Sequence, residues 1–163
     1  MRGRLVIFCG IPGSGKTTIA GLVAGFFDHS ILIETDGVRK MLAHPNFAPE
    51  ESKFVYDACF AIAKEALRAG YLVVLDGTFL KEEYRLEARR RLSRYYGEVY
   101  TVWVRCGLET ALDRNFSRKA VVPPDRLKVM LEAFQNPRVA IRVDSSRMSP
   151  ESSARRVITA LSR

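Results

Sequence analysis

The order of hydrophobic and polar residues predicts strands that alternate with helices. Short apolar runs without alternation are typical of strands buried on both faces, and segments with apolar residues at helical spacing separate them. The expected strands cover residues 5–8, 31–34, 71–75, 99–104 and 139–143. The expected helices cover residues 16–27, 38–42, 50–69, 81–95, 108–115 and 125–134, with a last one that opens at 149–151. This alternation predicts an α/β fold with a five-stranded, doubly wound parallel sheet between two helical layers.

Composition places the chain among ordinary soluble domains. Of 163 residues, 47% are hydrophobic and 27% are charged, and no apolar run approaches the roughly 20 residues of a membrane span. We expect one domain over residues 1–163. Because the first strand begins at Leu5, we expect no signal peptide and a cytoplasmic location. Cys9, Cys59 and Cys106 lack metal-ligand spacing, which predicts free thiols in a reducing compartment.

The loop after the first strand has the pattern G-x-x-x-x-G-K-T. Its glycines let backbone N–H groups approach phosphate oxygens, and the following helix adds its positive N-terminus. Lys16 is placed to reach the β- and γ-phosphates, and Thr17 can offer its hydroxyl to Mg²⁺. The pattern predicts a nucleoside triphosphate site that consists of Gly10, Ile11, Pro12, Gly13, Ser14, Gly15, Lys16, Thr17 and Thr18.

Two aspartates follow predicted strands, at the sheet edge where ligands gather. Asp36 is a candidate to accept the proton of an attacking hydroxyl, and the alternative is that it caps its helix. Arg39 lies three residues on, on the same helix face, and can grip an anionic acceptor group, unless it is simply solvated. Asp76 is expected to hold Mg²⁺ through water. Orientation of the acceptor and a plain turn remain alternatives for it.

A basic segment with a proline break predicts a lid over residues 114–124. Arg114 and Arg118 are four residues apart, so they share a helix face. The break at Pro123 and Pro124 favours a hinge, and closure would bring both guanidinium groups to the γ-phosphoryl oxygens. The alternative is a solvated basic helix.

The net charge of +8 suits an anionic partner such as nucleic acid, although triphosphate binding and surface placement also account for it. A second basic segment runs from residue 85 to residue 94. Glutamates at positions 82, 83 and 87 favour a salt-bridged solvated helix over a track for a polynucleotide backbone. Its arginines are Arg85, Arg89, Arg90, Arg91 and Arg94.

In this order and spacing the motifs resemble a family of phosphotransferases. The phosphate loop, Asp36-x-x-Arg39, Asp76 and the segment from Arg114 to Pro123 are similar to the kinase domain of polynucleotide 5′-hydroxyl kinases. They also resemble the kinase half of L-seryl-tRNA(Sec) kinase, and residues 35–42 are similar to adenylylsulfate kinases. The resemblance covers residues 4–137.

The resemblance implies a role for each matched residue. Lys16 would hold the phosphates, Thr17 would bind Mg²⁺, and Asp36 would be the general base. Arg39 would bind a phosphate of the acceptor, and Arg114 and Arg118 would act from the lid. Within these 163 residues we expect neither the phosphatase domain often fused to polynucleotide kinases nor the extra tRNA-gripping domain of the seryl-tRNA kinase.

The sequence thus predicts an ATP- and Mg²⁺-dependent kinase that acts on a hydroxyl group. A nucleic-acid acceptor, such as an RNA or DNA 5′ end or tRNA, or a nucleotide-derived one, is favoured, without a membrane partner. The segment from Asp76 to Phe79 is also found in small P-loop kinases, so a small metabolite such as adenylylsulfate is the alternative. A third hypothesis, from another class, is a nucleotide-binding regulatory NTPase.

Overall fold

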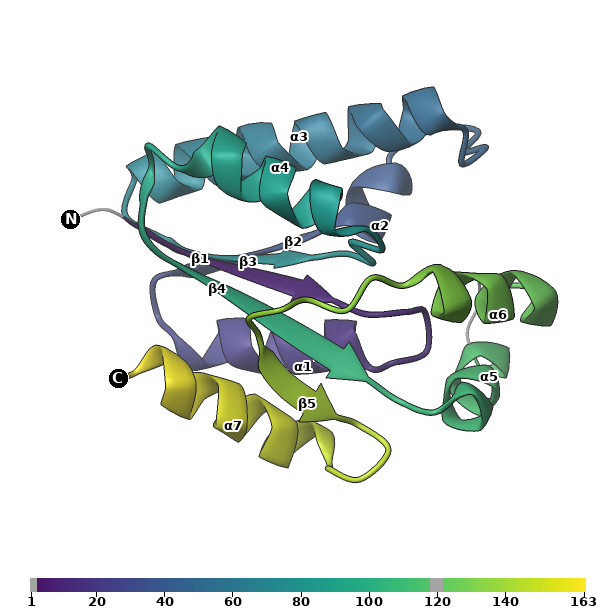
Figure 1. Ribbon diagram of the computed structural model, residues 1–163. Helices are drawn as coiled ribbons and strands as arrows, with labels where there is room; N and C mark the ends of the chain where they lie inside the picture. Colours follow the sequence, from purple (N-terminus) through teal and green to yellow (C-terminus); the bar gives the residue numbers. More distant parts are fainter. Residues whose placement is uncertain (1–2, 118–121) are drawn as a thin grey trace.

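The computed structural model describes residues 3–117 and 122–163, and it contains a five-stranded sheet (Figure 1). Its order is β2-β3-β1-β4-β5, and all neighbouring strands are parallel. This confirms the predicted sheet. The strands are β1 (Gly3–Cys9), β2 (Ser30–Glu34), β3 (Leu72–Asp76), β4 (Tyr96–Arg105) and β5 (Ile141–Asp144).

Helices cover both faces of the sheet and cluster at one end of it. Figure 1 shows α3 (Pro49–Arg68) and α4 (Glu82–Leu92) on one face, and α1 (Lys16–Phe26) and α7 (Pro150–Leu161) on the other. The shorter helices α2 (Thr35–Arg39), α5 (Leu108–Phe116) and α6 (Pro124–Ala133) lie beyond the carboxyl ends of the strands. The three-layer, doubly wound architecture is therefore confirmed. None of the described helices is long and apolar enough to cross a membrane.

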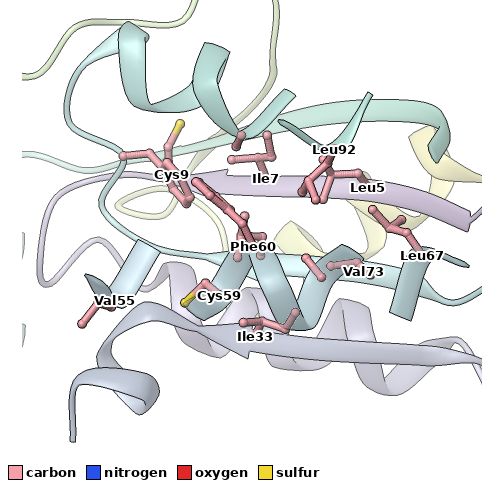
Figure 2. Packing of buried hydrophobic residues seen from close by; sticks show 14 residues of the cluster. Leu5, Ile7, Cys9, Ile33, Val55, Cys59, Phe60, Leu67, Val73 and Leu92 are labelled. Carbon is pink, nitrogen blue, oxygen red and sulfur yellow. The ribbon is translucent and has the colours of Figure 1, made fainter. Parts of the chain in front are cut away.

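The central strand β1 supplies both halves of the core, because successive side chains point to opposite faces. Figure 2 shows Leu5, Ile7 and Cys9 in the cluster that α3 and α4 cover. Val6 and Phe8 belong to the second cluster, under α1 and α7. All five side chains are fully buried, and each large one contributes roughly 1.5–3 kcal/mol of burial free energy. This burial on both faces explains why the strand reads as a continuous apolar run.

A few element boundaries differ from those expected. The helix expected to reach residue 95 ends at Leu92, and β4 begins at Tyr96, because Tyr96 already pairs with Gly3 of β1. The last strand begins at Ile141 rather than at residue 139, where its pairing with Val102 of β4 starts. At the opening of the last helix, the Ser149 hydroxyl accepts a hydrogen bond from the Ser152 backbone N–H, as the capping pattern predicts.

Candidate active site

The loop between β1 and α1 is shaped by backbone contacts that only glycine tolerates. Gly13 and Gly15 have φ of 79° and 83°, in the left-handed region. A Cβ at Gly13 would overlap the Ala111 carbonyl oxygen of α5, and one at Gly10 would overlap the Val104 carbonyl oxygen of β4. The loop therefore lies directly on β4 and α5. Ile11 anchors it in a small buried cluster with Ala111 and Leu127.

A cavity of about 250 Å³ opens in front of this loop, at the N-terminus of α1. The helix N-terminus, one lysine and one arginine converge there, which makes the cavity suited to a polyanion. Its lining residues are Gly13, Gly15, Lys16, Thr17, Thr18 and Arg114. The structure thus brings together the predicted phosphate-loop residues with one of the two predicted lid arginines.

Thr17, which lines this cavity, contacts Asp76. The Thr17 hydroxyl donates a hydrogen bond of 2.6 Å to Asp76 Oδ2, although the two residues are 59 positions apart. Asp76 ends β3, which pairs with β1 directly before the loop, so the sheet itself creates the contact. A hydroxyl beside a buried carboxylate offers the hard oxygen ligands that Mg²⁺ prefers, with waters and phosphates to complete its coordination. These two residues therefore fit a magnesium ion.

Arg114 is held beside the loop by Ser145, a residue that sequence reasoning missed. Arg114 Nη1 donates to Ser145 Oγ and Nη2 to the Ser145 carbonyl oxygen, both at 2.8 Å. The Ser145 hydroxyl in turn donates to the Ser14 carbonyl oxygen at 2.7 Å. Ser145 therefore links α5 to the phosphate loop. Its position directly after β5, at the ligand edge of the sheet, is the signal that could have found it.

The predicted lid is described at its two ends. The fully buried Asn115 donates from its amide to the Val122 carbonyl oxygen at 2.7 Å and accepts from the Val122 backbone N–H at 3.1 Å. This pair of bonds ties the end of α5 to the residue before the prolines. Arg118 lies outside the described residues, so its role on the lid stays a prediction.

Asp36 lies at the carboxyl end of β2, in the first turn of α2, and is exposed. The N-cap of this helix is Glu34, without a side-chain capping bond, so the alternative that Asp36 caps its helix is wrong. The chain enters the helix one residue before Asp36, so its side chain no longer stands at the cap position. Its carboxylate faces solvent at the sheet edge where the nucleotide cavity also opens.

Arg39 is not the solvated residue that the alternative predicted. Its guanidinium forms an ion pair with Glu51 of α3, and Nη2 donates to Ser52 Oγ at 3.2 Å. The side chain is only 12% exposed. The guanidinium that was expected to bind an acceptor phosphate is therefore already paired with the Glu51 carboxylate.

Glu51 also holds the loop that precedes α3. It accepts hydrogen bonds from the backbone N–H groups of Asn46 at 2.6 Å and Phe47 at 3.1 Å. The Asn46 N–H, followed by the Phe47 N–H and Arg39, holds the pKa of the Glu51 carboxyl below its ordinary value. Glu51 therefore stays ionised near neutral pH and fixes both the loop and Arg39.

Phe47, on this loop, lies near two arginines from other elements. It is 54% exposed and has φ of 58°, which is strained for a residue with a side chain. The Arg39 guanidinium lies 4.6 Å from the centre of its ring, and that of Arg126 from α6 lies 5.6 Å from it. Sequence reasoning missed Phe47, Glu51 and Arg126, because no local pattern connects α6 with a loop so far away in the chain.

The arginines of α4 are mostly engaged within the fold, which corrects the prediction of a solvated salt-bridged helix. Arg85 is 3% exposed and donates to the carbonyl oxygens of Phe79 and Gln135, each at 2.5 Å. Arg89 donates to the Thr101 hydroxyl at 2.7 Å. These two arginines share the inward face of α4, so they pack against the sheet.

Only Arg91 follows the expected pattern, because it forms ion pairs with Asp57 and Glu87. Arg90 and Arg94 are exposed. Much of the segment is therefore unavailable as a track for a polynucleotide.

The three cysteines are free thiols, as predicted. Burial raises the pKa of Cys9 to about 12 and that of Cys59 to about 11, so both stay protonated. Within residues 3–117 and 122–163, no cluster of three or more histidine, cysteine or acidic side chains is arranged to hold a metal ion. The Thr17–Asp76 pair does not need such a cluster, because Mg²⁺ keeps several waters.

Comparison with known proteins identifies the family. Residues 5–137 match the family described as AAA domain. The chain belongs to this AAA domain family. The L-seryl-tRNA(Sec) kinase of Methanococcus maripaludis is 25% identical to this AAA domain protein over 137 residues, which are 82% of this chain and 53% of the relative. The chain thus spans about half the length of that curated relative.

Solved structures share the fold of this AAA domain protein. The APS kinase of Mycobacterium tuberculosis, in complex with AMPPNP and APS, has a TM-score of 0.79 at 21% identity, with 99% of each chain covered. A chain of the Pnkp1/Rnl/Hen1 RNA repair complex has a TM-score of 0.72 at 18% identity, over 82% of this chain and 44% of that chain. The resemblance drawn from the motifs is therefore confirmed.

Proposed function

We propose that the protein is a kinase that uses ATP and Mg²⁺ to phosphorylate a hydroxyl group. The cavity at the phosphate loop supports this function most directly, because Lys16, Thr17 and Arg114 line it at one helix N-terminus, and Thr17 is hydrogen-bonded to Asp76. The names of the relatives and of the structural neighbours, which include kinases of seryl-tRNA and of APS, support the same reaction class.

In this proposal the nucleotide is held by the loop. Backbone N–H groups and Lys16 bind the β- and γ-phosphates, and Thr17 and Asp76 hold Mg²⁺. When bound, the metal ion neutralises charge on the phosphate oxygens. Arg114, positioned by Ser145, adds a guanidinium at the same cavity, and Arg118 is proposed to join it from the lid.

Asp36 is proposed as the general base. Its carboxylate takes the proton from the acceptor hydroxyl while that oxygen forms a bond to the γ-phosphorus. The bond from the γ-phosphorus to the β,γ-bridging oxygen breaks, and ADP leaves with the electron pair. Exposure of Asp36 at the carboxyl end of β2 suits this role, because an incoming acceptor can reach it from solvent. A nucleotide switch would not need such a base.

We infer that the acceptor is nucleic acid or a nucleotide-derived molecule. The exposed Phe47 ring offers a surface for stacking a base, and Arg39 and Arg126 beside it offer charge for a phosphate. To bind the Arg39 guanidinium, an acceptor phosphate would have to displace the Glu51 carboxylate from it. A small metabolite such as adenylylsulfate would use the same aromatic and basic groups, since it contains a nucleotide.

Transfer of label from γ-labelled ATP into three acceptor pools tests the proposal. The pools are 5′-hydroxyl oligonucleotides, bulk tRNA, and small metabolites that include adenylylsulfate. Label in any pool supports a kinase, and label in a polynucleotide or a nucleotide supports the inferred acceptor. Label only in free phosphate would contradict the kinase and favour the regulatory NTPase.

A further inference from the structure

A broad hollow in the described surface lies on the β5–α7 side of the molecule, away from the phosphate loop. It has a volume of about 810 Å³ and is formed by the start of β5 and the outward side of α7. Figure 1 shows these two elements side by side, with β5 at the edge of the sheet. We name this hollow the arginine groove. Its residues are Ala140, Ile141, Arg142, Ser152, Arg155, Arg156, Thr159, Ala160 and Arg163.

Positive charge dominates the groove. Four of its lining residues are arginines, all exposed, and none of the described lining residues is acidic. Across the described part of the chain, none of these four guanidinium groups takes part in an ion pair. The contrast with α4 is clear, because there Arg85, Arg89 and Arg91 are bonded to carbonyl, hydroxyl and carboxylate oxygens. The arginine groove therefore gathers four arginines without ion-pair partners on one surface.

We propose that the arginine groove binds the sugar–phosphate backbone of a polynucleotide. Guanidinium groups donate forked pairs of hydrogen bonds that match phosphate oxygens. The hydroxyls of Ser152 and Thr159 add neutral donors of the kind that contact phosphates and sugars. The inference rests on the proposed function in one respect, because it makes the hydroxyl acceptor a polymer.

The position of the groove selects a polymer over a single nucleotide. β5 and β2 are the two edges of the sheet, and Asp36 follows β2. Four spacings of about 4.8 Å separate these edges, which gives about 19 Å. A mononucleotide at Asp36 cannot reach the groove, whereas a nucleic-acid chain or a folded RNA spans that distance. The groove would then contribute affinity only for long acceptors.

A membrane surface suits the groove less well. A helix that lies on a bilayer needs an exposed apolar face. Of the apolar residues of α7, Ala154, Val157 and Leu161 are buried, and the partly buried Ile158 packs against the same core cluster. Hydrogen-bond donors in a hollow favour a backbone that enters it over a flat anionic surface.

Fluorescence anisotropy with a labelled 5′-hydroxyl RNA tests the proposal without any catalytic step. The probe has about 20 nucleotides, more than the roughly 4–16 that a single OB fold covers, so it is long enough to span several phosphate contacts. The test variant is Arg155→Ala/Arg156→Ala. The matched control is Arg90→Ala/Arg94→Ala, at the end of α4 and just after it, which removes the same charge from another exposed surface. Thermal unfolding of both variants verifies that each is folded.

The proposal predicts that the test variant raises Kd for the RNA roughly tenfold at low salt, and that the control changes it little. Each lost phosphate contact lowers the slope of log Kd against log salt by about 0.7. The slope measured for the test variant, which loses two contacts, should therefore be about 1.4 smaller than that of the wild type. Arg142→Ala should lower it by a further ~0.7. Equal effects of the two double variants, or an effect of the control alone, would overturn the proposal.

Two further measurements separate the arginine groove from the kinase proposal. Phosphorylation of a mononucleoside acceptor should be unchanged in Arg155→Ala/Arg156→Ala, while KM for the RNA rises. RNA binding that depends on the groove, in a protein that transfers no phosphate to any acceptor, would contradict the kinase and retain the groove. Binding to phosphatidylserine vesicles but not to RNA, lost in the same variant, would overturn the polynucleotide in favour of a membrane.

Discussion

The two halves of the candidate active site differ in how they are held. At the nucleotide half, the loop backbone lies on β4 and α5, Thr17 contacts Asp76, and Ser145 fixes Arg114. At the acceptor half, the key guanidinium of Arg39 is bound to Glu51. In the proposed mechanism the nucleotide half is thus ready for its ligand, whereas the acceptor half would first exchange an internal ion pair for a substrate contact.

This difference has a physical cause. The nucleotide half is built from backbone groups between a central strand and a helix, and such groups cannot move without disrupting the sheet. The acceptor half is built from side chains on α2 and on the loop before α3, which Glu51 holds through two backbone N–H groups. A bound phosphate offers the Arg39 guanidinium a charged, forked partner of the same kind as the Glu51 carboxylate, so it can replace this side-chain contact.

The largest effect is expected from Lys16→Ala. Loss of the charge that meets the transferring phosphate should lower transfer by roughly 10³-fold or more. Initial rates of label transfer measure it, and Lys40→Ala, at an exposed position on the end of α2, is the control. Robust transfer by Lys16→Ala would refute the assignment of the nucleotide half.

The second largest effect is expected from Asp36→Asn, which should slow the chemical step and leave the nucleotide half unaffected. Because Asp36 is assigned to proton transfer and not to ATP binding, kcat should fall by about 10²–10⁴ while ATP affinity is retained. Steady-state kinetics and calorimetric titration with ATP measure the two quantities. Asp28→Asn, at an exposed turn, serves as the control. An unchanged kcat would remove Asp36 from the chemistry.

A smaller effect is expected from the pair Arg39 and Glu51. Arg39→Ala should raise KM for a phosphorylated acceptor about tenfold or more, and much less for an unphosphorylated one, because a charged hydrogen bond is lost. Glu51→Gln should lower KM for the phosphorylated acceptor a few-fold, since it frees the guanidinium, and should leave KM for ATP unchanged. Equal shifts for both acceptors would contradict a phosphate-binding role of Arg39.

The smallest effect is a pH dependence of the acceptor loop. The pKa of Glu51 is lowered from its ordinary value of 4.5, first by the Asn46 N–H. The stabilisation of the loop by ionised Glu51 is therefore fully present above pH 4.5. It is lost as the pH falls through the lower pKa that Glu51 has in the folded protein. Amide exchange at Asn46 and Phe47 should accelerate in that acidic range. This acid-induced acceleration of exchange should be absent in Glu51→Gln. If it persists in that variant, another titrating group causes it.

Much of the fold was predictable because it rests on local patterns. Apolar runs predict central strands, and the phosphate loop carries its own conformation in its glycines. Asp76 could be placed near Thr17 because parallel strands bring their carboxyl ends to one edge. These inferences need only neighbouring residues and the rules of a doubly wound sheet.

The remaining features depend on contacts between distant segments. Arg85 is buried because the carbonyl oxygens of Phe79 and Gln135 converge on it, and Gln135 is 50 residues away. Phe47 gains a second arginine only through the placement of α6. Charge counting along α4 cannot reveal such partners, so it misjudged which arginines remain exposed.

The most direct test follows where the γ-phosphoryl group goes in the wild type and in Asp36→Asn. Both proteins receive γ-labelled ATP, Mg²⁺ and the three acceptor pools, and label is counted in acceptors and in free phosphate. We predict that the wild type labels a hydroxyl-bearing acceptor and that Asp36→Asn, although it binds ATP, does not. Label that appears only as free phosphate, at the same rate in both proteins, would contradict the assignment of this site to phosphoryl transfer.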